Sequence, residues 1–363
     1  MEGVRRVDRL ADIKVVGVGG AGGNAVVRMA EVGLKGVEFV VVNTDAQALG
    51  VIETEKQLQI GEAITSGLGS GGDPQVGQES AEENRKEVEE ILDRPDMVFI
   101  TAGLGGGTGT GAAPVIAQVA KEIGALTVAV VSKPFTFEGP RRNEVAIGGA
   151  EALTGAVDAL ITIPNDKLLS IVEKRTTIID AFNVADDVLR QAVQGISDLI
   201  TSSGHINVDF ADVKAVLRDA GTALMGIGLG SGENRAAEAA QGAISSPLLE
   251  SSIEGARNVL FNITGSSNML LSEIDEAAQI ITQAIDSREA NIIWGLVFDD
   301  EMAEQVRITV VATGFGEPTR AEPRVPRFQP GQSEQEVSTV PESPTAEDID
   351  DINVPTFLRE KKK

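Results

Sequence analysis

Gly105-Gly106-Gly107-Thr108-Gly109-Thr110-Gly111 follows an apolar, strand-like run at residues 97–101 and precedes an amphipathic, helix-like stretch at residues 112–123. A second glycine-rich segment, Gly17-Val18-Gly19-Gly20-Ala21-Gly22-Gly23-Asn24, occupies the same setting after a strand-like run at residues 13–16. Glycine lets the backbone approach a ligand closely, and a following helix presents free N–H groups and a positive dipole end to an anion. Two such loops on one sheet predict a polyphosphate held from both sides.

Apolar runs of strand length alternate with helix-like stretches over residues 12–165. Strands are expected at residues 13–16, 38–42, 97–101, 126–131 and 159–163, and helices at 25–32, 80–92, 112–123 and 142–153. Continuous Val/Ile runs separated by helices are typical of a parallel sheet buried on both faces. We therefore expect a doubly wound α/β domain with right-handed connections, which binds its ligand at the carboxyl edge of its strands.

A long central helix and a smaller α/β domain are expected next. Apolar residues recur at helical spacing over residues 178–203, and Gly204 is well placed to end that helix. Beyond it, helical patterns at 213–218, 235–244 and 272–285 alternate with strands at 223–228, 258–263, 292–298 and 306–312. The expected parts are an N-terminal extension (1–11), a ligand-binding domain (12–177), the central helix (178–204), a second domain (205–316), a disordered linker (317–347) and a terminal peptide (348–363).

The composition of the 363-residue chain excludes several classes of function. Its 31 Lys and Arg against 55 Asp and Glu give a net charge of −24, which argues against a nucleic-acid partner, since that surface needs a basic patch. No apolar run reaches the roughly 20 residues that span a bilayer. The chain has no signal-peptide core and no cysteine for disulfides or thiolate metal sites. We therefore expect a cytoplasmic protein without a transmembrane anchor.

The first loop by itself indicates a Rossmann oxidoreductase. It contains Gly17-x-Gly19-x-x-Gly22, and Asp45 follows the second strand, as in dinucleotide-binding folds. A dinucleotide fold has no need of the second loop, however, and no P-loop Gly-x-x-x-x-Gly-Lys-Ser/Thr occurs in the chain. Without a lysine, the phosphates must depend on backbone N–H groups, the hydroxyls of Thr108 and Thr110, and a divalent metal such as Mg²⁺.

The second loop resembles the signature loop of the tubulin/FtsZ superfamily. Together with the first loop and Asn207-Val208-Asp209-Phe210-Ala211-Asp212, it resembles the FtsZ family of bacterial division proteins over residues 10–316. The resemblance implies a GTPase with GTP or GDP and Mg²⁺ bound, which polymerises head to tail. It further implies a contractile ring at the mid-cell division site, whose filaments turn over through GTP hydrolysis between subunits.

The resemblance also implies which residues bind the nucleotide. The two loops would wrap the phosphates, Glu138 and Arg142 would contact the ribose, and Asn165 would lie near the ribose and base. The full set of implied nucleotide-binding residues is Gly19, Gly20, Ala21, Gly22, Gly23, Asn24, Asn43, Asp45, Gly103, Gly106, Gly107, Thr108, Gly109, Thr110, Glu138, Arg142, Asn165, Phe182 and Asp186.

Phe182 and Asp186 can be checked by chemistry alone. They are four residues apart and so share one face of a helix. An aromatic ring can stack on a base, and a carboxylate accepts two hydrogen bonds from guanine N1–H and its amino group. Adenine has a lone pair at N1, which the same carboxylate would repel, so the pair predicts specificity for guanine. The alternative is a core phenylalanine beside a solvated aspartate.

Hydrolysis requires an oriented water, often held by a carboxylate. Asp209 and Asp212 follow the central helix, in the second domain, so they could act only on the nucleotide of a neighbouring subunit. The resemblance implies the same arrangement, with Asn207 assisting, and a head-to-tail contact that does not close produces an open filament. Two alternatives stay open: Asn207 or Asp209 caps the next helix, or the pair is inert and the protein is a non-hydrolysing scaffold.

The tail predicts a binding site for other proteins. Seven of the 14 prolines lie after residue 316, among Glu, Ser, Thr and Gln, as in disordered linkers. Residues 349–359 then carry the apolar side chains of Ile352, Val354, Phe357 and Leu358 before Arg359. Such a short apolar segment in a polar tail favours partner binding. The resemblance implies that the partners are membrane-adaptor and regulatory division proteins.

Overall fold

The computed structural model of the chain describes residues 11–169, 175–201, 208–246, 248–249, 251–285 and 290–315. The expected helix stop at Gly204, the candidate catalytic Asn207, and the linker and tail after residue 316 lie outside the described residues.

Six parallel strands form one half of a ten-stranded sheet, in the order β3-β2-β1-β4-β5-β6. All five expected strands are present, each one or two residues longer at its carboxyl end. The unexpected β3 lies at the edge of the sheet, and its sequence, KQLQ, has a single apolar residue and therefore no strand pattern. The strands are β1 (Ile13–Val18), β2 (Glu38–Asn43), β3 (Lys56–Gln59), β4 (Met97–Gly103), β5 (Leu126–Lys133) and β6 (Ala159–Pro164).

The helices of this half begin earlier than their apolar periodicity predicts. α1 begins at Gly19 and α6 at Thr108, because their first turns consist of glycine, alanine and threonine rather than apolar periodic residues. The helix expected at 80–92 is two helices, interrupted at Asn84. The elements are α1 (Gly19–Glu31), α2 (Ala46–Gly50), α3 (Glu62–Thr65), α4 (Pro74–Glu83), α5 (Arg85–Leu92), α6 (Thr108–Glu122), the short 3₁₀ helix η1 (Thr136–Glu138), α7 (Pro140–Ala156) and α8 (Asn165–Leu168).

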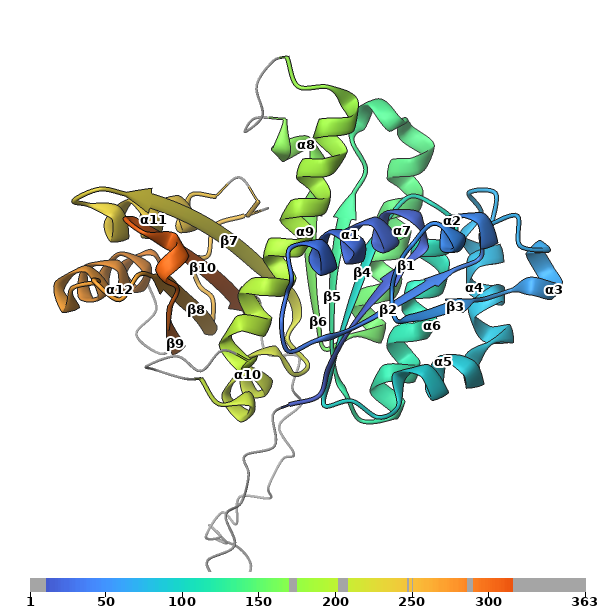
Figure 1. The fold of residues 1–363 in the computed structure, drawn as a ribbon, viewed down its shortest axis with the longest axis horizontal. Helices are drawn as coiled ribbons and strands as arrows, with labels where there is room; N and C mark the ends of the chain where they lie inside the picture. Colours follow the sequence, from blue (N-terminus) through green and yellow to red (C-terminus); the bar gives the residue numbers. More distant parts are fainter. Residues whose placement is uncertain are drawn as a thin grey trace, which may run out of the picture. The chain divides into compact units, whose positions relative to one another are not determined.

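The parallel sheet is buried on both faces. α1 and the long α9 (Ile178–Thr201) pack against one face, where Val15 and Phe99 are fully buried. α5, α6 and α7 cover the other face, where Val16 and Ile100 are buried (Figure 1). Successive side chains of each strand therefore point into two different apolar cores, one on each face of the sheet. This arrangement confirms the doubly wound α/β architecture.

The second half of the sheet continues from the first through only three residue pairs, from Ala159–Gly221 to Ile161–Ala223. Its order is β7-β10-β8-β9, with β10 antiparallel to both neighbours and β8 parallel to β9. A third apolar core lies between this sheet and two helices, α11 and α12. The elements are α10 (Phe210–Leu217), β7 (Gly221–Ser231), α11 (Arg235–Ile244), β8 (Asn258–Gly265), α12 (Leu271–Ile285), β9 (Asn291–Phe298), η2 (Asp300–Met302) and β10 (Gln305–Thr313).

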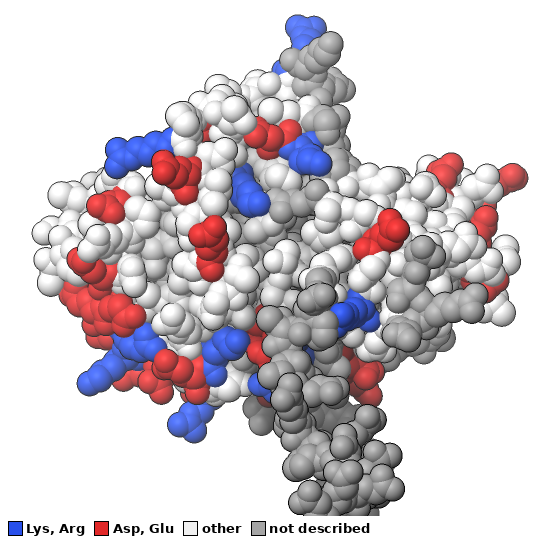
Figure 2. Space-filling model, turned by 180° about the vertical axis from the view of Figure 1, so that it is seen from behind, with Lys and Arg blue, Asp and Glu red and all other residues white. Residues whose placement is uncertain are grey.

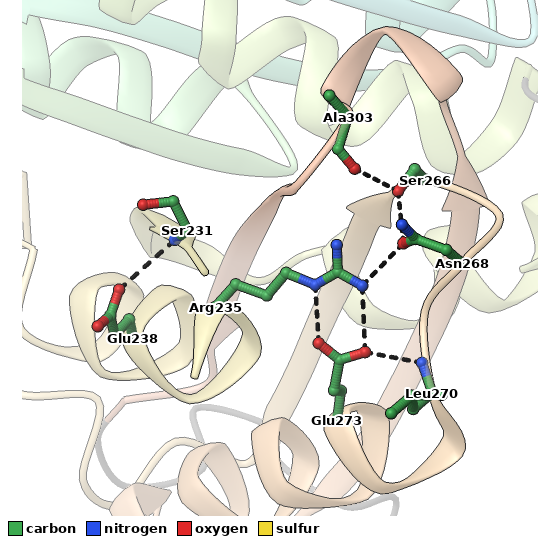
Figure 3. Close-up of polar contacts among 8 residues, drawn as sticks. All are labelled: Ser231, Arg235, Glu238, Ser266, Asn268, Leu270, Glu273 and Ala303. Carbon is green, nitrogen blue, oxygen red and sulfur yellow. Dashed lines mark hydrogen bonds and ion pairs between the residues drawn. The ribbon is translucent and has the colours of Figure 1, made fainter. Parts of the chain in front are cut away.

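A buried polar cluster holds the helices of this second half together (Figure 3). Arg235 of α11 pairs with Glu273 of α12 through Nε–Oε1 at 2.7 Å and Nη2–Oε2 at 3.2 Å, and also donates to Oδ1 of Asn268 at 2.8 Å. Ser266 Oγ donates to the carbonyl of Ala303 at 2.5 Å, in the turn before β10. Fork-to-fork Arg–carboxylate pairing fixes direction as well as distance, so this cluster sets how α11 and α12 pack.

Charged side chains are spread over the surface, with acidic groups gathering at the lower left of Figure 2, the side of α4 and α5. Among the described residues, no helix is long and apolar enough to cross a membrane.

Candidate functional site

The two glycine-rich segments meet at the carboxyl ends of β1 and β4, where the strand order changes direction. These strands are neighbours, with Val18 paired to Ala102. Gly19 has φ +73°, and a Cβ atom there would lie 3.0 Å from the backbone nitrogen of Gly109, so the segments touch directly. The amino ends of α1 and α6 therefore converge on one point, which is where open α/β sheets bind anionic ligands.

The glycines of this site fall into two groups. At Gly22 a Cβ atom would overlap the carbonyl oxygen of Thr101, and at Gly109 it would lie 2.7 Å from the carbonyl oxygen of Gly103, so these glycines let helices pack closely on strands. A Cβ atom on Gly20 or Gly106 would instead meet nothing within 4 Å. These two backbones border open space, so a ligand can approach them closely.

A third glycine-rich segment, which the sequence analysis missed, completes this end of the sheet. Ser66-Gly67-Leu68-Gly69-Ser70-Gly71-Gly72-Asp73 has four glycines at positive φ and leads into α4, which Asp73 caps. It meets the second loop directly, because a Cβ atom on Gly107 would lie 2.8 Å from the backbone nitrogen of Asp73. Its glycine density was the available signal, but no apolar strand immediately precedes it.

Three hydroxyl groups gather at the amino end of α6. Thr108 is buried, and its Oγ1 lies 2.7 Å from Oγ1 of Thr44 and 3.0 Å from Oγ of Ser70. Thr110 has a different role, because its hydroxyl oxygen accepts a 2.9 Å hydrogen bond from the N–H of Gly105 and so closes the loop. Thr108 therefore belongs to a cluster that joins the second and third loops to the segment after β2, whereas Thr110 holds the second loop in shape.

The carboxyl end of β2 offers oxygen ligands beside this cluster. Asn43 is buried and accepts from the N–H of Asp45, and Oδ1 of Asp45 caps α2 by accepting from Gln47 and Ala48. Among the described residues, no group of three or more His, Cys, Asp or Glu could hold a metal ion. These residues fit Mg²⁺ that is carried mainly by phosphate oxygens and water, with one or two protein oxygens at most.

The segment after β5 borders the second loop on its other side. A Cβ atom on Gly105 would lie 2.7 Å from the carbonyl oxygen of Arg142. The carboxylate of Glu138 accepts from the N–H of Phe135 at 2.9 Å and also pairs with the guanidinium of Arg142, which is 57% exposed. The pair is thus anchored at its carboxylate end and open to solvent at its cationic end.

Asn165, at the carboxyl end of β6, holds an unsatisfied polar atom. The residue is only 5% exposed, and its Oδ1 is buried without a hydrogen-bond partner among the described residues. A buried acceptor without a donor is costly, of the order of 1–3 kcal/mol. A ligand hydroxyl or N–H group would satisfy it, which fits the expected position beside a ribose or base.

Phe182 and Asp186 share a face of α9, as expected. The ring of Phe182 meets buried Phe135 edge to face, with centroids 5.6 Å apart, yet the residue remains 39% exposed. Burial raises the pKa of Asp186 to about 6, and the positive charge of Arg28 on α1 only partly opposes this. An open aromatic ring and a partly desolvated carboxylate that makes no ion pair with any described residue suit a base that stacks and donates hydrogen bonds.

Asp209 and Asp212 are not part of this cluster. They lie at the start of α10, at the far end of α9 from α8 (Figure 1). At 1.5 Å per residue, α9 separates Phe182 from Thr201 by roughly 28 Å. Both aspartates are exposed. Asp209 occupies the N-cap position of α10, but its side chain makes no capping hydrogen bond there.

Comparison with known proteins identifies related domains on both halves of the chain. Residues 12–173 match the model of the Tubulin/FtsZ family, GTPase domain, and residues 221–316 match that of the FtsZ family, C-terminal domain. The first range contains all three glycine-rich loops. Asp209 and Asp212 lie between the two ranges.

Solved structures agree with this assignment. An empty FtsZ dimer from M. jannaschii is 46% identical, covers 85% of this chain and 89% of its own, and superposes with a TM-score of 0.81. A tryptophan-to-tyrosine mutant of M. jannaschii FtsZ is also 46% identical, with coverage of 84% and 91% and a TM-score of 0.80. CetZ2 from Haloferax volcanii, solved as a GTPγS-bound protofilament, is 21% identical, with coverage of 84% and 94% and a TM-score of 0.72, which shows a shared fold alone.

Proposed function

The chain belongs to the tubulin/FtsZ family and carries its GTPase domain, and from this we propose that it hydrolyses GTP between the subunits of a head-to-tail filament. One observation carries the proposal. The residues suited to hold a nucleotide gather at the carboxyl ends of the strands, whereas the exposed carboxylates of Asp209 and Asp212 lie at the far end of α9. A complete site therefore needs two subunits.

In the proposed site, each half has its own task. The backbone N–H groups at the amino ends of α1 and α6 bind the phosphates, and Gly20 and Gly106 leave room for them. Mg²⁺, when bound with the nucleotide, neutralises phosphate charge. Asp209 and Asp212 of the adjoining subunit accept hydrogen bonds from the attacking water and orient it, with Asn207 assisting.

Base recognition belongs to α9. The ring of Phe182 stacks on the guanine, and the Asp186 carboxylate accepts from N1–H and the amino group. Glu138 and Arg142 contact the ribose, and the unsatisfied Oδ1 of Asn165 accepts from the nucleoside. The related structures include a dimer and a protofilament, which supports self-association as the state in which this site is used.

We also propose a cellular role. The filaments form the contractile ring at the division site in the cytoplasm, and residues 349–359 recruit membrane-adaptor and regulatory proteins. The 46%-identical structures come from M. jannaschii, so these comparisons support the division family and leave the bacterial source as an expectation from the resemblance.

The GTPase rate measured against protein concentration tests the proposal. A site shared between subunits predicts that the rate per subunit is negligible at low concentration and rises above a threshold. Asp212→Ala should bind GTP as the parent does and lose turnover by about 10²-fold or more. It should also lower the rate of parent chains when the two are mixed.

Asp219→Asn is the matched control. Asp219 follows α10, is 75% exposed, and has φ +50°, a conformation that asparagine tolerates. Its rate should equal that of the parent. A rate per subunit independent of concentration would refute the shared site. No hydrolysis at any concentration would favour a scaffold, and co-purified flavin or nicotinamide absorbance would favour an oxidoreductase.

A further inference from the structure

An open groove lies at the amino ends of β1 and β2, away from the nucleotide loops. It has a volume of about 560 Å³, and its apolar lining comes from Ala11, Ile13, Ala30, Val37 and Phe39. Its polar lining is almost entirely acidic, consisting of Asp12, Glu38, Glu53, Thr54 and Glu55. Within the part of the chain that the structure describes, no lysine or arginine lines it.

The carboxylates of this groove differ in how far they are neutralised. Glu38 pairs with Lys14 at 2.6 Å and also with Lys56, and these cations lower its pKa against the opposing effect of burial. Glu53 and Glu55, which precede β3, are exposed and make no ion pair with any described residue. The groove therefore combines an apolar floor with a wall of uncompensated negative charge, and it fits a segment that is both apolar and basic.

The chain supplies such a segment directly beside the groove. Residues 1–10, which lie outside the described range, read Met-Glu-Gly-Val-Arg-Arg-Val-Asp-Arg-Leu. Arg5, Arg6 and Arg9 outnumber Glu2 and Asp8, so the side-chain charge is +1 in a chain whose net charge is −24. Apolar residues recur at every third position, at Val4, Val7 and Leu10.

Continuity of the chain selects this segment over other basic stretches. Ala11, the next residue, is itself part of the groove wall. In a polyproline II conformation, which repeats every three residues and rises about 3.1 Å per residue, Val4, Val7 and Leu10 share one face and residues 4–10 can reach across the groove without any linker. A tethered segment this short has an effective concentration in the millimolar range, which makes even weak contacts sufficient. The lysines at 361–363 are also basic, but more than 40 residues separate them from the last described residue.

We propose that residues 1–10 dock in the groove of their own subunit, with Val4 and Val7 on the apolar floor and Arg5, Arg6 and Arg9 facing Glu53 and Glu55. The docked segment joins the carboxyl end of α1 to β2 and to the residues that lead into the edge strand β3. It thereby holds the end of α1 opposite to the phosphate loop. This inference does not depend on GTP hydrolysis and can be tested without nucleotide.

Disulfide trapping tests the docking cleanly, because the chain has no cysteine of its own. In the full-length protein, Val7→Cys is combined with Thr54→Cys on the groove wall. A disulfide requires the two Cα atoms to come within about 7 Å. Under mild oxidation, an intramolecular cross-link should form at least roughly tenfold faster than in a control that pairs Val7→Cys with Thr154→Cys, since Thr154 is exposed on α7.

A charge exchange tests the proposed pairing. Glu53→Arg with Glu55→Arg should slow the cross-link several-fold, and so should Arg5→Glu with Arg6→Glu. All four changes together should restore it, and 1 M salt should slow only the parent and the restored variant. Failure of the combined variant to recover would overturn the assigned charge pairing.

The size of the cross-linked product shows which segment occupies the groove. A monomeric cross-linked species supports the proposal, whereas a cross-linked dimer would mean that the segment docks on a second copy. Equal rates for the groove pair and the Thr154 control would overturn docking altogether. Removal of residues 348–363 should leave the rate unchanged, and an increased rate would show that the C-terminal tail occupies the groove instead.

Discussion

Asp186→Asn should change which base the protein binds while leaving its fold intact. The carboxylate has two acceptor oxygens for guanine N1–H and the amino group, whereas the amide has one acceptor and directs its own N–H groups at the remaining donor. In the variant, one buried N–H donor of guanine has no acceptor and the negative charge is gone, which together weaken the free energy of binding by about 2–3 kcal/mol. GTP affinity should therefore fall by about 10²-fold. Xanthosine triphosphate has a carbonyl in place of the amino group, so the variant should bind it more tightly than the parent does.

The same residue predicts a pH dependence. Burial raises the pKa of Asp186 to about 6, and only the ionised form accepts both guanine donors. The ionised fraction is about 0.9 at pH 7 and about 0.1 at pH 5, so affinity should fall roughly tenfold between them, or about 1.4 kcal/mol. The stability of the nucleotide-free protein changes with pH in the opposite direction to its affinity for GTP. Because the folded-state pKa is raised from 3.8, the nucleotide-free fold binds this proton more tightly, and that stabilisation is lost as the pH rises through about 6.

Equilibrium nucleotide binding at pH 5, 6 and 7 checks both effects. The phosphates of GTP also titrate in this range, but equally for all variants, so the difference between parent and Asp186→Asn isolates the carboxylate. Asp180→Asn, an exposed aspartate on the same helix, is the matched control and should behave as the parent. The reasoning would be refuted if Asp186→Asn bound GTP within twofold of the parent, or if the two shared one pH profile.

Two further predictions follow from packing. Gly22→Ala places a methyl group against the carbonyl oxygen of Thr101 and should lower the free energy of unfolding by about 1–3 kcal/mol, measured by thermal unfolding. Gly20→Ala places its methyl group in open space, so this variant should keep the Tm of the parent and lose GTP affinity. Equal Tm values for the two variants would contradict this prediction. Glu273→Gln removes the charge opposite Arg235 and should lower the free energy of unfolding by about 3 kcal/mol at pH 7. The pairing with Arg235 lowers the pKa of Glu273, so the stabilisation is present above its usual value of 4.5 and is lost as the pH falls through the lowered pKa. The free energies of urea unfolding of parent and variant should therefore converge in acid.

The elements that could be predicted are those whose signal is local. Apolar runs located β1, β2, β4, β5 and β6 to within two residues, because a strand buried on both faces must be apolar throughout. β3 was not predicted because its sequence, KQLQ, has no apolar run. This edge strand is stabilised by backbone pairing with β2 rather than by burial. The third glycine-rich loop, from Ser66 to Asp73, was missed because it does not directly follow an apolar strand.

The sequence by itself determined that a parallel sheet carries two glycine-rich loops and that Phe182 and Asp186 share a helical face, because periodicity and glycine content act between neighbours in the chain. Only the tertiary structure decided what each residue does there. Gly22 and Gly109 allow packing while Gly20 and Gly106 border open space. Likewise, the acceptor of Asn165 is left without a partner among the described residues, and burial raises the pKa of Asp186. Burial and close approach are properties of residues brought together by folding, and no local pattern encodes them.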